Sequence, residues 1–140
     1  MNVYLVDTDV ISEARKGAKA NAGVRAFFRD AAKSRVGLYL SAVTIGELRQ
    51  GVEAVRYRGD AASAGRLALW LERVSGEYAD AVLSLDAEAA DVWGRLRVPH
   101  PENPLDKQIA ATALIYDLTV VTRNTAHYEI PGLQVLNPFV

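Results

Sequence analysis

Short apolar runs alternate with longer segments of helical periodicity along the whole 140-residue chain. The apolar runs have the length of buried strands, and residues 119–121 are β-branched throughout. The longer segments carry apolar residues at every third or fourth position. We predict strands at residues 3–6, 36–40, 81–85, 118–122 and 133–136. Between them we predict helices at about residues 20–34, 42–58, 61–78, 87–96 and 105–116, with a short helix after the first strand.

This alternation predicts an α/β fold with a mainly parallel sheet of about five short strands and right-handed connections. No internal repeat, linker or low-complexity tract interrupts the pattern. We therefore expect a single domain over residues 1–140, a length sufficient for a self-contained core.

Three acids stand where a parallel sheet would bring side chains together. Asp7 directly follows the first apolar run, and Glu47 lies early in the helix after the second strand. Asp106 lies in the first turn of a helix after the proline-rich loop 99–104. Because ligands bind outside the carboxyl ends of parallel strands, we expect Asp7 and Glu47 at one sheet edge. Asp106 reaches the same edge only if the loop carries it there.

Each acid also has a plainer interpretation when it is taken alone. Asp7 could be a helix N-cap, and Glu47 and Asp106 could be surface acids at the starts of helices. Asp9 and Glu13 we interpret as a helix cap and a surface charge. Only the combination of Asp7, Glu47 and Asp106 favours a functional site.

Three converging carboxylates repel one another unless a cation neutralises them. Hard oxygen ligands, with no cysteine and only two scattered histidines, suit Mg²⁺ or Mn²⁺ better than zinc. A divalent ion held by carboxylates can activate water and polarise a phosphodiester. The acids therefore predict a Mg²⁺ or Mn²⁺ site.

Charge and composition narrow the possible partners. The formal net charge is −1, so nucleic acid would have to bind at a local basic patch or a metal site. Residues 15–35 are strongly basic, and their polar side is either a solvated helix face or a phosphate-binding surface. Its candidate RNA-binding residues are Arg15, Lys16, Lys19 and Arg25. The absence of cysteine excludes a thiol nucleophile, and without a signal peptide or membrane-spanning run we expect a cytoplasmic protein.

Four segments together resemble the motifs of PIN-domain proteins, most closely the VapC and FitB toxin branch. They are residues 5–13, 41–51, 103–113 and 120–124, in the family's order and spacing. The resemblance implies a three-layer α/β/α fold and an Mg²⁺- or Mn²⁺-dependent endoribonuclease. It also implies that Asp7, Glu47 and Asp106 hold the metal.

The closing segment departs from the family pattern. Asn124 and His127 stand where the family often carries acids, so we expect a single metal rather than two. Asn124, Thr8 and Thr122 could still orient ligands or phosphate through their amide or hydroxyl groups. His127 could be a neutral hydrogen-bonding group, although a plain surface turn is the interpretation we favour.

The resemblance also implies partners for the chain. These are an RNA substrate, a second copy in a homodimer, and a VapB- or FitA-like antitoxin over the helices near Phe27 and Phe28. The antitoxin would send a basic side chain into the acidic pocket, and operator DNA would be bound only through it.

Two other functions remain open from the sequence. A PIN-type binding module could have lost catalysis through Asn124 and His127. A haloacid-dehalogenase-like phosphatase would use Asp7 as a nucleophile, but Ala64 stands where its second downstream acid should follow Asp60.

Overall fold

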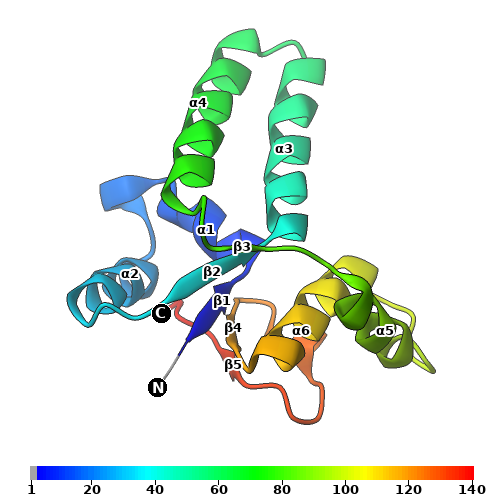
Figure 1. The fold of residues 1–140 in the computed structure, drawn as a ribbon. Coiled ribbons are helices and arrows are strands. Elements are labelled where there is room, and N and C mark those ends of the chain that lie inside the picture. Colours follow the sequence, from blue (N-terminus) through cyan, green and yellow to red (C-terminus); the bar gives the residue numbers. More distant parts are fainter. Residues whose placement is uncertain (1–2) are drawn as a thin grey trace.

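Five short strands form one parallel sheet in the computed structural model, which describes residues 3–140 (Figure 1). The strand order is β3-β2-β1-β4-β5, and every neighbouring pair is parallel. The predicted parallel sheet is therefore confirmed. The strands are β1 (Tyr4–Val6), β2 (Leu38–Ser41), β3 (Val82–Leu83), β4 (Thr119–Val121) and β5 (Val135–Leu136).

The helices match the predicted segments to within a few residues at each end. They are α1 (Thr8–Ala14), α2 (Ala22–Lys33), α3 (Ala42–Tyr57), α4 (Ala61–Glu77), α5 (Ala87–Leu96) and α6 (Pro104–Tyr116). Two short 3₁₀ helices lie outside the predicted helices, η1 (Gly17–Lys19) and η2 (Thr125–Tyr128). The sequence indicated only a polar turn at η2. Polar side chains cap the starts of five helices by accepting backbone N–H groups. They are Asp7 at α1, Asn21 at α2, Ser41 at α3, Asp60 at α4 and Asp86 at α5.

Alternating side chains of the central strands form two separate cores. Val6 and Val121 are fully buried in the core that also holds residues of α1, α2, α3 and α4. Leu5 and Val120 point to the opposite face, where they pack with residues of α6 and with the partly buried Leu96 of α5. The predicted three-layer α/β/α arrangement is confirmed.

The central strands end together at one edge of the sheet. Val6 pairs with Val121, and the next residue, Asp7, donates its backbone N–H to the Val121 carbonyl at 2.9 Å. Thr122 continues β4 in the same way by donating its N–H to the Leu136 carbonyl. This register places Asp7 beside Thr122 at the carboxyl end of the sheet.

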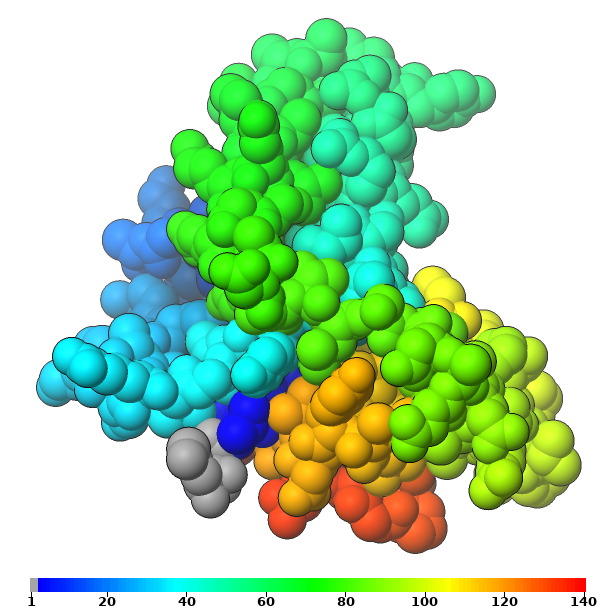
Figure 2. All heavy atoms as spheres, in the orientation of Figure 1, coloured from blue at the N-terminus to red at the C-terminus, as the bar shows by residue number. Residues whose placement is uncertain are grey.

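Helices α3 and α4 form a hairpin that projects from the body of the domain (Figures 1 and 2). Leu48 and Val52 of α3 and Leu71 and Val74 of α4 join its base to the larger core. Across residues 3–140, the helices are too short or too polar to span a lipid bilayer.

The C-terminal segment is bound to the start of α2. Asn21 donates its side-chain amide N–H to the Val140 carbonyl at 2.9 Å, and its Oδ1 accepts the Val140 N–H at 3.1 Å. A Cβ at Gly23 would overlap the carbonyl oxygen of Pro138. The close packing of α2 on the C-terminal segment therefore requires glycine at this position.

We expect Gly23→Ala to lower the free energy of unfolding by about 1–3 kcal/mol, because the backbone of Pro138 must move away. Gly51→Ala is the matched control, since a Cβ there meets nothing within 4 Å inside α3. The control should gain about 0.5–1 kcal/mol from helix propensity. Urea denaturation of the two variants measures both effects, and equal stabilisation by both would contradict the packing argument.

Candidate active site

Asp7 is held at the end of β1 by three hydrogen-bond donors. Its Oδ1 accepts the Thr8 backbone N–H at 2.8 Å, which makes Asp7 the N-cap of α1. Its Oδ2 accepts the Thr122 hydroxyl at 2.8 Å and the Tyr128 hydroxyl at 3.1 Å. The residue is only 3% exposed, and this burial raises the pKa of the Asp7 carboxyl to about 6, against the lowering effect of the Thr122 hydrogen bond.

Asp9 is not the helix cap that we expected. It lies in the first turn of α1, and its Oδ2 accepts the Arg123 backbone N–H at 2.9 Å. Its Oδ1 is buried and has no hydrogen-bond partner among residues 3–140. Burial raises the pKa of Asp9, and the charge of Asp106 adds to this rise. Asp9 therefore belongs to the acidic cluster.

Asp106 is joined to His127 across the mouth of the site. Its Oδ2 lies 2.6 Å from the imidazole Nδ1, and both side chains are partly exposed. The interpretation of His127 as a plain surface turn is therefore wrong, because η2 turns the ring toward Asp106. The proline-rich loop ends at Asn103, which is left-handed at φ 53° and starts α6 so that Asp106 lies in its first turn.

Glu47 is connected to the other acids through Thr8. The Thr8 hydroxyl lies 2.7 Å from Glu47 Oε1 and 3.0 Å from Thr44 Oγ1. Since a hydroxyl carries one proton, Thr8 donates to the carboxylate and accepts from Thr44. This pair of bonds ties the second turn of α3 to the start of α1.

The carboxylates of Asp7, Asp9 and Asp106 lie close enough for their charges to act on one another. Asp9 and Asp106 each raise the pKa of Asp7, after the larger effect of burial. Across the part of the chain that the structure describes, however, no three carboxylate or imidazole groups are close enough to hold one ion. One oxygen of Asp106 is bonded to His127 and one oxygen of Glu47 is bonded to Thr8, so each of these two acids has its other oxygen outside these bonds.

Thr122 and Asn124 have different roles from each other. Thr122 is fully buried, donates to Asp7 and accepts the Asn124 backbone N–H at 3.0 Å. The Asn124 side chain is exposed, and only its backbone takes part in this network.

Tyr128 is a residue of the site that the sequence analysis missed. Its side chain is only 1% exposed, and its hydroxyl donates a hydrogen bond to Asp7. Burial and the charge of Asp7 raise the Tyr128 pKa, so its hydroxyl stays protonated.

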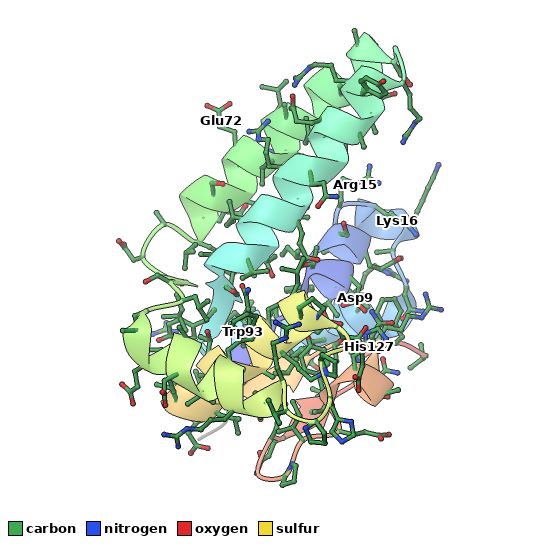
Figure 3. The ribbon with its side chains drawn as sticks, turned by 90° about the vertical axis from the view of Figure 1, so that its right-hand side faces the viewer. Asp9, Arg15, Lys16, Glu72, Trp93 and His127 are labelled. Atoms are coloured by element: carbon green, nitrogen blue, oxygen red, sulfur yellow. The ribbon has the colours of Figure 1, made fainter. Side chains whose placement is uncertain are left out.

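The predicted basic stretch is divided among several elements. Arg15 and Lys16 are exposed near the end of α1 (Figure 3). Lys16 forms a salt bridge with Glu13 at 2.9 Å, and Arg25 donates its Nε–H to the Ala20 carbonyl.

Glu13 is more than the surface charge we expected. Its Oε2 also accepts the Asn21 backbone N–H, and this bond holds α1 against the start of α2.

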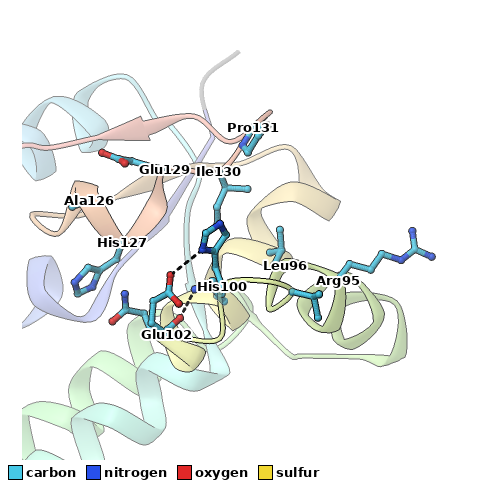
Figure 4. A pocket seen from close by; sticks show the side chains of 12 residues that line it. Arg95, Leu96, His100, Glu102, Ala126, His127, Glu129, Ile130 and Pro131 are labelled. Carbon is cyan, nitrogen blue, oxygen red and sulfur yellow. Dashed lines mark hydrogen bonds and ion pairs between the residues drawn. The ribbon is translucent and has the colours of Figure 1, made fainter.

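A hollow of about 420 Å³ adjoins the acidic cluster, between α5, the proline-rich loop and η2 (Figure 4). Both histidines line it, but they face different acids. The His100 Nδ1 lies 3.5 Å from Glu102, whereas His127 is bonded to Asp106. The histidines therefore do not form a pair, in agreement with the sequence analysis.

The fold and the acidic cluster define a class of protein. The PIN domain family model matches residues 4–133, and the chain belongs to that family. VapC ribonuclease Y4jK of Sinorhizobium fredii is 33% identical over 146 residues, which cover 98% of both chains. Toxin FitB of Neisseria gonorrhoeae is 32% identical, over 98% of this chain and 99% of its own. The crystal structure of FitAcB from the same organism superposes with a TM-score of 0.82 at 31% identity, over 97% of this chain and 98% of that chain.

Because burial raises the Asp7 pKa from 3.8 to about 6, the ionised carboxylate opposes folding of the metal-free protein. This penalty is absent below pH 3.8, grows as the pH rises toward 6, and is complete above that. We expect Asp7→Asn to stabilise the metal-free protein by roughly 2–3 kcal/mol at neutral pH, with a gain that vanishes near pH 4.

Thermal unfolding from pH 4 to 8 in a chelator measures this gain. Asp30→Asn is the control, because Asp30 is an exposed acid on α2. A stabilisation by Asp7→Asn that does not change with pH would contradict the assigned cause.

Proposed function

We propose that the protein is a divalent-metal-dependent endoribonuclease that acts as the toxin of a type II toxin–antitoxin pair. The observation that carries this proposal is the group formed by Asp7 at the end of β1, Asp9 in the first turn of α1 and Asp106 in the first turn of α6, with the buried Asp9 Oδ1 lacking a partner within residues 3–140. The relatives named VapC ribonuclease and Toxin FitB, similar over nearly the whole chain, support the same reaction class and role. Nothing in the site or in these relatives favours the phosphatase or the inactive binding module.

The donor set fits a hard divalent cation. Asp7, Asp106 and Glu47 would hold Mg²⁺ or Mn²⁺, and Asp9 adds a fourth carboxylate that the sequence analysis did not include. All four are oxygen donors, and the chain has no cysteine that would select a softer metal. When bound, the ion supplies Lewis-acid activation of water and neutralises charge on the phosphodiester.

The chain's own residues position the carboxylates for this chemistry. Thr122 and Tyr128 restrain one oxygen of Asp7, while Thr8 restrains one oxygen of Glu47. Glu47 therefore keeps a second oxygen for a ligand, whereas Asp7 would bind one through oxygens that already accept hydrogen bonds. Asp9 lies in the first turn of α1, where the helix dipole also favours negative charge.

We propose an antitoxin as the protein partner, with operator DNA bound only through it. Support comes from the solved FitAcB complex and from a further FitAB structure bound to a DNA fragment, which superposes with a TM-score of 0.82 at 29% identity. Phe27 and Phe28 are half-buried and pack on the larger core, with Phe27 in edge-to-face contact with Tyr4. The antitoxin would therefore meet the edges of these rings, and a homodimer remains part of the proposal.

Asp106→Asn and Glu47→Gln should each abolish Mn²⁺-dependent cleavage of RNA by the protein without an antitoxin. The loss should exceed the roughly 10–100-fold that removal of an outer-shell partner costs. Asp91→Asn, an exposed acid on α5, is the control and should keep full activity. Gel analysis of a transfer- and ribosomal-RNA panel measures cleavage and names the site, and full activity of Asp106→Asn would overturn the assignment.

His127 should act as a positioning residue for Asp106. His127→Ala should weaken Mn²⁺ binding about tenfold, because the carboxylate loses the group that orients it. His127→Asn keeps a hydrogen-bonding group and should restore part of the affinity. Isothermal titration calorimetry in the absence of RNA measures this, with His100→Asn as the control in the same hollow. Unchanged affinity in His127→Ala would contradict the positioning role.

A further inference from the structure

Four arginines from three helical elements meet around one hollow outside the acidic cluster. Arg15 follows α1, Arg58 follows α3, and Arg66 and Arg73 lie on α4. The hollow has a volume of about 500 Å³, and the half-buried indole of Trp70 forms part of its wall. Arg66, Trp70 and Arg73 recur at intervals of three and four residues, so they share one face of α4.

The guanidinium groups of this hollow form no salt bridge within residues 3–140, although Arg66 donates a hydrogen bond to the Ser63 hydroxyl at 2.9 Å. All four arginines are exposed, and no carboxylate within residues 3–140 lies close enough to form a salt bridge with any of them. The hollow contains one acid, Asp60, whose Oδ1 accepts the Ser63 N–H as the cap of α4. By contrast, Arg49 and Arg56 on α3 both pair with Glu53. The hollow thus holds an excess of about three positive charges in a protein of net charge −1.

We infer that this arginine hollow binds the phosphate backbone of single-stranded RNA beside the cleavage site. The inference rests on the proposed function. It extends the predicted RNA contact of Arg15 to three arginines that the sequence analysis did not include, Arg58, Arg66 and Arg73. Proteins bind single-stranded nucleic acid by combining guanidinium groups, which bind phosphates by charge, with an aromatic ring on which a base can stack. Here the half-buried indole of Trp70 provides the ring. An acidic protein segment would satisfy the arginines but would leave the indole without a stacking partner.

The position of the hollow agrees with a strand that also enters the acidic cluster. Helix α1 begins next to Asp7 and runs to Arg15, so its two ends belong to the two sites (Figure 3). Eight residues of helix span roughly 12 Å, at about 1.5 Å per residue. At about 3.4 Å per stacked nucleotide, this corresponds to roughly three or four nucleotides. The hollow therefore contacts RNA a few nucleotides from the bond that is cleaved.

The test measures binding of a fluorescein-labelled 12-nucleotide RNA in a chelator, where no cleavage is expected. Each phosphate contact on a single strand contributes about 0.7 to the slope of log affinity against log salt. Arg58→Gln and Arg66→Gln should each lower that slope by about 0.7, and thus the affinity about fivefold near 0.1 M salt. Arg29→Gln is the matched control, because Arg29 is an exposed arginine of α2 outside the hollow.

A second measurement tests the role of the indole. In Trp93→Phe, Trp70 is the only tryptophan left, since the chain has two. Its fluorescence should be quenched by RNA in proportion to binding. Unchanged RNA affinity and salt slope in the double variant Arg58→Gln/Arg66→Gln, with a native circular dichroism spectrum, would overturn the inference. If the double variant lost affinity only for an acidic antitoxin peptide and not for RNA, the inference would also be overturned. The hollow would then be identified as a protein-binding site.

The two proposals fail in different ways. If the arginine hollow does not bind RNA but the protein is a ribonuclease, the double variant binds and cleaves RNA like the wild type. If the function is wrong, the wild type shows no metal-dependent cleavage in any RNA panel. In that case RNA binding that depends on Arg58 and Arg66 would still support the hollow.

Discussion

The burial of the Asp7 carboxylate is the constraint on which the rest of the site depends. A buried carboxylate is costly unless its oxygens are hydrogen-bonded, and three donors from two parts of the chain meet this need. β1 lies between β2 and β4, so the acid at its end has neighbours on both sides. The parallel register of β1 and β4 brings Thr122 beside it. The sheet topology thus determines where the acid is and what holds it.

The need to hydrogen-bond the buried Asp7 carboxylate also explains how the segment after β4 folds. Tyr128 is buried by the 3₁₀ helix η2, and its raised pKa keeps the hydroxyl a donor to Asp7. The turn that buries Tyr128 also turns His127 toward Asp106. Its first residues supply the Arg123 N–H to Asp9. One short polar segment therefore contacts three acids, two through its side chains and one through its backbone.

The sequence alone predicts what local patterns control, and misses what tertiary contacts decide. Strand and helix periodicity predicted the parallel sheet and the places of Asp7 after β1 and of Glu47 early in α3. The three layers followed from the family resemblance, and periodicity did not place Asp106 at the sheet edge. Asp9 was misassigned because a cap and a first-turn acid look alike in sequence, and Asp7 took the cap. Tyr128 and His127 stand in a turn whose polar sequence gives no direction for either side chain. The roles of these two side chains become clear only in the folded structure, where η2 lies against the end of β1 and the start of α6.

The separation of the two charged sites follows from the electrostatics of the acids. An arginine inside the acidic cluster would form ion pairs there and compete with a divalent cation for the same oxygens. At roughly 12 Å along α1, the arginine hollow lies beyond the Debye length of about 10 Å at 0.1 M salt. The acids therefore keep their affinity for a cation, while a polyanion long enough to span α1 can contact both sites. The net charge of −1 gives no sign of this arrangement, because the negative charges of the acidic cluster and the positive charges of the arginine hollow largely cancel in the total.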